Sequence, residues 1–102
     1  MITYDKIINQ YDFYKACYEK IDVLYWNNIS YTANGEASFP PQIRHKLKEA
    51  YTIYRTEEAT TLTLINDYSK SLFKLYEDKI SLMKRDMADY DDRIKKMLNK
   101  IL

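Results

Sequence analysis

Glycine and proline, the residues that most readily interrupt helices, occur only between residues 35 and 41 of this 102-residue chain. Asn34-Gly35 is typical of a turn with positive φ, and Pro41 has the fixed φ that suits the first turn of a helix. We therefore expect a loop over residues 30–40, with helices on both sides of it.

The segment before the loop carries an apolar stripe at helical spacing. Its members alternate steps of four and three residues, which places them on one helix face: Ile7, Tyr11, Tyr14, Tyr18, Ile21 and Tyr25. Thr3 is a residue type that favours the N-cap position. These features predict a first helix over residues 4–29.

Two further stripes follow the loop. The first comprises Ile43, Leu47, Ala50, Tyr54, Thr61, Leu64 and Tyr68. The second is an a/d heptad seam of Phe73, Tyr76, Ile80, Met83, Met87, Tyr90, Ile94, Met97 and Ile101. A step of five residues separates the stripes at a cluster of Asn, Asp and Ser side chains, which compete with helix by bonding to their own backbone. We therefore predict helices over 41–66 and 70–101.

Three helices of similar length predict an all-α fold. We expect a single helical domain over residues 1–102, built as a three-helix antiparallel bundle with a coiled-coil-like C-terminal helix. The alternative keeps residues 42–101 as one helix, which would be about 90 Å long. The first helix covers only part of such a rod, so the alternative predicts an oligomer.

The sequence offers little for catalysis. One histidine and one cysteine cannot build a protein-only zinc site. His45 lies among cations on the predicted outer face, and Cys17 lies at the edge of a stripe, where an inert thiol is usual. We expect no catalytic residues, no metal and no cofactor.

Glu57 interrupts the second stripe. Pairing with Lys15 or Lys20 would explain it, and a polar specificity position or a pocket acid is the alternative.

Charge and hydropathy limit the partners. The net charge of +1 disfavours nucleic acid, with a basic end at Lys95, Lys96 and Lys100 as the weak exception. No apolar run reaches the length of a membrane span, and the first residues do not resemble a signal peptide. We expect a cytoplasmic protein that does not associate with a membrane.

These exclusions favour a non-catalytic protein–protein interaction module. The abundance of Ile, Lys, Asn and Tyr, which have AT-rich codons, adds the expectation of a small phage or mobile-element accessory or inhibitor protein that occludes a larger protein partner. Aromatic residues of the first helix are the candidate contacts, because tyrosine and tryptophan are enriched at interfaces: Tyr11, Tyr14, Tyr18, Tyr25 and Trp26. The competing interpretation places the tyrosines in the core, where each hydroxyl needs a partner.

A second functional hypothesis is a structural or assembly protein that forms a homo-oligomer through the last seam. Its candidate contacts are Phe73, Tyr76, Ile80, Met83, Met87, Tyr90, Ile94 and Met97. Trp26 lies off the main stripe, so it either closes one end of the bundle or is an exposed anchor.

Overall fold

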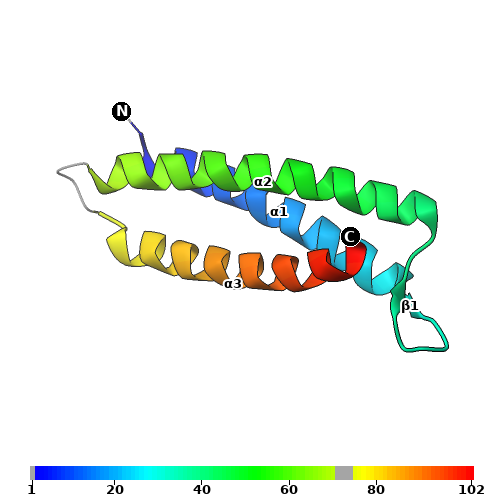
Figure 1. Ribbon diagram of the computed structural model, residues 1–102. Coiled ribbons are helices and arrows are strands. Elements are labelled where there is room, and N and C mark those ends of the chain that lie inside the picture. The colour runs from blue at the N-terminus through cyan, green and yellow to red at the C-terminus, as the bar shows by residue number, and fades with distance from the viewer. Residues whose placement is uncertain (1, 71–74) are drawn as a thin grey trace.

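A computed structural model describes residues 2–70 and 75–102, which form three helices and one short hairpin (Figure 1). In chain order these are α1 (Tyr4–Asn28), β1 (Ser30–Tyr31), β2 (Ala37–Ser38), α2 (Pro41–Ser69) and α3 (Glu77–Ile101). Each helix runs antiparallel to the one before it, so α1 and α3 point the same way (Figure 1). The predicted all-α helical bundle is confirmed.

The first helix begins and ends almost where the sequence predicted. The Thr3 side chain accepts a hydrogen bond from the Lys6 backbone N–H at 3.3 Å, which satisfies one of the free donors of the first turn. The following loop contains a hairpin that was not predicted, in which Ser30 pairs with Ser38 and Tyr31 with Ala37. Gly35, with φ of 81°, permits the tight turn between these strands.

The break between α2 and α3 differs from the prediction. α2 continues to Ser69 rather than residue 66, and the Ser69 hydroxyl bonds to the Ile65 carbonyl at 2.9 Å, a bond that is compatible with the helix. α3 begins at Glu77 rather than residue 70, after Tyr76 in the left-handed conformation. Such a residue ends a right-handed helix. The alternative of one helix over 42–101 is therefore wrong, and the molecule is 57 Å long.

Residues of all three predicted stripes fill the centre of the bundle. The largest fully buried side chains are Tyr14 of α1 and Tyr54 of α2, whose rings lie 5.3 Å apart. Aliphatic and methionine side chains of α3 close the third side of the core. Within residues 2–70 and 75–102, none of the helices combines the length and the apolar character needed to cross a bilayer.

Candidate interaction site

The structure places four of the five predicted contact residues inside the bundle. Tyr11, Tyr14, Tyr18 and Tyr25 are each at most 8% exposed. Of the two interpretations of these tyrosines, the core interpretation therefore holds, and the open aromatic face is not formed. Tyr14 and Tyr18 find partners for their hydroxyls on α2 and α3, and the ring of Tyr25 packs on Phe39 before α2, so the four side chains are core residues.

The buried hydroxyls are linked across all three helices. The oxygens of Tyr14 and Tyr54 lie 3.1 Å apart, and the Tyr14 hydroxyl also donates to the Met87 carbonyl at 3.4 Å. The Tyr18 hydroxyl accepts a hydrogen bond from Arg93 Nη1 at 3.3 Å. Burial raises the pKa of both Tyr14 and Tyr54, so these hydroxyls stay neutral.

Two carboxylates on α2 and α3 complete this network. The Tyr54 hydroxyl lies 3.3 Å from Glu58 Oε2 and 3.5 Å from Asp91 Oδ1, and Arg55 pairs with both carboxylates. Burial, followed by the neighbouring Asp91, raises the pKa of Glu58. Burial also acts to raise the pKa of Asp91, but the hydrogen bond from Lys95 and the other charged neighbours hold it below its usual range. The pair is therefore part of the packing between α2 and α3.

The heptad seam of α3 is occupied by the same chain. Ile80, Met83, Met87, Ile94 and Met97 are buried, and Tyr90 is half-buried with its ring stacked on Tyr18. Tyr76 is exposed and stacks on Tyr4 at 4.1 Å between ring centres. Phe73 lies outside the described residues. The described part of the seam therefore offers no open stripe for a second copy.

The two residues considered as catalytic candidates, His45 and Cys17, show no sign of a reactive site. His45 is exposed and lies 2.8 Å from Glu49. Cys17 is half-buried, and burial raises its pKa, which disfavours the reactive thiolate.

Glu57 accepts a hydrogen bond from Gln10 at 2.7 Å rather than pairing with Lys15 or Lys20. Gln10 also lies 3.3 Å from Thr61, so the polar interruption of the stripe is satisfied by a neighbouring amide.

Of the five aromatic contact residues predicted on the first helix, Trp26 alone lies on the surface. Its side chain is 58% exposed near the C-terminal end of α1. Its Nε1 donates to Asp22 Oδ1 at 3.1 Å, and its ring meets Tyr25 edge-on at 4.9 Å between centres. The indole is therefore accessible, and its contacts with Asp22 and Tyr25 orient it.

Trp26 borders a cleft of about 590 Å³ at the end of the bundle that carries the hairpin. Its lining comes from α1, β1 and α3: Asp22, Tyr25, Trp26, Tyr31, Arg93, Lys96, Met97 and Lys100. We call it the Trp26 cleft. Tyr31, 63% exposed, is its second aromatic rim residue, and buried Tyr25 and Met97 are its inner apolar residues. The volume falls within the range of pockets that hold ligands.

The charge of the Trp26 cleft is positive, with three cations against the single carboxylate of Asp22. Arg93 pairs with Asp89 at 3.1 Å and donates to Tyr18. Lys96 and Lys100 form no ion pair with any other residue that the structure describes. Their ammonium groups are therefore available to a bound molecule.

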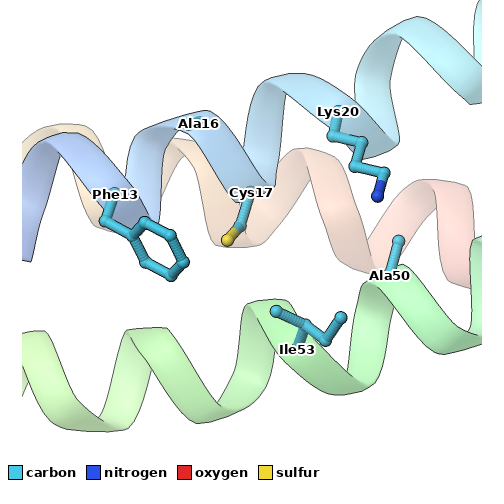
Figure 2. A pocket seen from close by; sticks show the side chains of 6 residues that line it. All are labelled: Phe13, Ala16, Cys17, Lys20, Ala50 and Ile53. Atoms are coloured by element: carbon cyan, nitrogen blue, oxygen red, sulfur yellow. The ribbon is translucent and has the colours of Figure 1, made fainter.

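A smaller hollow of about 310 Å³ lies between α1 and α2 (Figure 2). Exposed Phe13 and Ile53 flank it, and Ala16, Cys17 and Ala50 complete its mostly apolar lining, with Lys20 at one end. It is the principal alternative contact surface.

Sequence reasoning singled out Trp26 and Lys100 separately but did not bring them together. Tyr31 was missed because it lies in a segment expected to be an irregular loop. The Trp26 cleft forms because the C-terminal ends of α1 and α3 lie side by side. This alignment depends on the residue at which α3 begins. A single sequence pattern does not carry that information.

Comparison with protein-family models, with curated proteins and with solved structures gave no significant match. The function must therefore be inferred from the residues of the site itself.

Proposed function

We propose that this protein is a non-catalytic interaction module that binds a protein partner through the Trp26 cleft. The observation that carries the proposal is an exposed tryptophan fixed by Asp22 and Tyr25. Tryptophan is among the residues most enriched where interfaces gain their binding energy. A side chain that is already ordered loses little conformational entropy on binding.

The positions of the buried tyrosines and of the two partly buried carboxylates support an interaction role over an enzymatic one. The tyrosines and the Glu58–Asp91 pair hold the three helices together through their polar groups. Catalysis needs titratable groups that face a substrate in a shared site. In the Trp26 cleft, the carboxylate of Asp22 is bonded to the indole, and the remaining charged groups are cations.

We propose further that binding acts by occlusion, with this 57 Å bundle covering a functional surface of a larger partner. The cytoplasm as the place of action and a phage or mobile-element setting belong to the same proposal. They rest on composition alone, whereas the binding site rests on geometry.

The test compares three immobilised proteins in a capture experiment with quantitative mass spectrometry: wild type, Trp26→Ala and Leu82→Ala. Leu82 is an exposed apolar residue of α3 outside the Trp26 cleft, so its replacement is a matched control. The captured protein is then purified, and its dissociation constant is measured for each variant by calorimetry.

We expect Trp26→Ala to weaken binding by about 30-fold, as for an interface hot spot worth about 2 kcal/mol, while Leu82→Ala stays close to wild type. Circular dichroism confirms that both variants are folded. Equal affinities for the two variants would overturn the proposal.

A further inference from the structure

We infer that the occupant of the Trp26 cleft is an extended acidic segment of the partner protein, with an apolar side chain next to its carboxylates. This inference rests on the proposed function and specifies the chemistry of the partner. It follows from the charge of the Trp26 cleft, the spacing of its cations and the position of its apolar surface.

The available positive charge comes from Lys96 and Lys100. Both side chains are exposed, and neither has an ion-pair partner among the described residues. Arg93 adds a third cation whose position is fixed by Asp89 and Tyr18. Complementary charge across an interface raises the association rate and selects partners. A segment that presents carboxylates meets this requirement.

The spacing of the two lysines favours an extended segment. They lie four residues apart on α3, which corresponds to about 6 Å along the helix axis. In an extended chain, side chains two residues apart lie on the same side and are separated by about 6.6 Å. Two acidic residues separated by one residue therefore match Lys96 and Lys100.

An apolar side chain completes the match. Trp26 and Tyr31 expose aromatic surface on the rim, and Met97 lies at the inner wall beside the lysines. A leucine or phenylalanine two residues away from the acidic pair lies on the same side of an extended chain, where it would cover this surface and exclude water from the adjoining ion pairs. Such anchors in pockets contribute most of the energy of many interfaces.

Single-stranded nucleic acid is the competing occupant, because exposed aromatic rings and cations also bind stacked bases and phosphates. Two observations favour the acidic peptide. The Asp22 carboxylate lies 3.1 Å from the indole nitrogen and would repel the phosphate of a nucleotide stacked on Trp26, whereas the peptide places an apolar side chain there and its carboxylates at Lys96 and Lys100. Asp89 lies against Arg93, so the positive surface is interrupted rather than continuous along α3.

Trp26 is the only tryptophan of the chain, so its fluorescence reports on the Trp26 cleft directly. The purified full chain is titrated with a peptide containing Glu-Leu-Glu-Asp-Leu, with its Gln/Asn counterpart, and with oligothymidylate. Each titration is made in about 0.05 M and about 0.5 M salt, because screening weakens exposed ion pairs. The double variant Lys96→Glu/Lys100→Glu is compared with Lys48→Glu/Lys84→Glu, which changes the net charge equally outside the Trp26 cleft.

We expect the wild-type chain to bind the acidic peptide saturably in low salt. The affinity should be at least about tenfold weaker with the amide peptide, in high salt, or with the Lys96→Glu/Lys100→Glu variant. The Lys48→Glu/Lys84→Glu variant should bind the acidic peptide in low salt as tightly as wild type. Equal binding of the amide peptide, equal loss in both charge variants, or tighter binding of oligothymidylate would overturn the inference.

The two proposals can fail separately. If Trp26→Ala loses the captured partner while the acidic peptide does not bind, the interaction function stands and the acidic occupant is wrong. If the peptide binds as expected while no captured protein depends on Trp26, the occupant chemistry stands and the proposed function is wrong.

Discussion

The hydroxyl oxygens of Tyr14 and Tyr54 lie 3.1 Å apart in the centre of the bundle, and Tyr54 also reaches the carboxylates of Glu58 and Asp91. This arrangement joins α1, α2 and α3 through one polar network. It satisfies the hydroxyls of the two most deeply buried tyrosines of the core.

Removing the central hydroxyl tests the network. Tyr54→Phe keeps the ring but removes the hydroxyl that Tyr14 and Glu58 share, which leaves Tyr14 only its 3.4 Å bond to the Met87 carbonyl. We expect the free energy of unfolding to fall by about 1–3 kcal/mol. Chemical denaturation followed by circular dichroism measures the change. Tyr51→Phe, at a half-buried position one turn away, is the matched control and should differ from wild type by less than about 0.5 kcal/mol. Equal effects of the two substitutions would show that the network contributes nothing specific.

The two carboxylates should give opposite pH dependences. Because the pKa of Glu58 is raised in the folded protein, its ionisation costs stability as pH rises through the usual carboxyl range near about 4 and above. Glu58→Gln removes this cost. The stability of the variant relative to wild type should therefore be greater at neutral pH than below that range.

Asp91 should behave in the opposite sense. Its lowered pKa means that the folded state favours the carboxylate, so its contribution is present above the usual carboxyl range and is lost as pH falls through its folded pKa. Asp91→Asn should therefore destabilise the protein more at neutral pH than in acid. Denaturation curves over this range measure both differences. If the difference in unfolding free energy from wild type changed with pH in the same direction for both variants, the result would contradict this account.

The burial of the α3 seam predicts a monomer. Met87 is buried against the other helices, so Met87→Lys places an unpaired charge in the core and should cost about 3 kcal/mol or more. Light scattering on the wild type should give the mass of one chain, and circular dichroism should show loss of helix in the variant. Leu82→Lys, at an exposed position of the same helix, should remain folded. An oligomeric wild type that Met87→Lys converts to a folded monomer would instead restore assembly through the seam.

The fixed orientation of Trp26 can be tested without a partner. Asp22→Ala removes the acceptor of the indole N–H, so we expect the ring to move more freely and its fluorescence anisotropy to decrease. Glu19→Ala, an exposed acidic position one turn earlier, is the control. Unchanged anisotropy in Asp22→Ala would mean that packing on Tyr25 alone holds the ring.

Much of the fold could be predicted because it depends on local pattern. The 4-3 spacing of apolar residues from Ile7 to Tyr25 defines a buried helix face, and all six members of that stripe are buried. The side chain of Thr3 caps the helix as its residue type suggests. Such features need no knowledge of what lies on the other side of the core.

The rest depends on contacts between distant segments. Tyr76 adopts the left-handed conformation where its ring stacks on Tyr4, which is 72 positions earlier in the chain, and this sets where α3 begins. The Trp26 cleft likewise needs three separate elements. Whether the tyrosine stripe of α1 is core or surface was also undetermined, since the partners of its hydroxyls come from other helices: Tyr54 of α2, and the Met87 carbonyl and Arg93 of α3.

Site-specific photocrosslinking in cells tests the central claim most directly. A photoreactive amino acid is placed at Tyr31, on the rim of the Trp26 cleft, or at Ile53, beside the α1–α2 hollow. The proposed function predicts a discrete protein adduct from position 31 that disappears when Trp26→Ala is introduced in the same chain, and no such adduct from position 53. A protein adduct from position 53 alone, insensitive to Trp26→Ala, would contradict it.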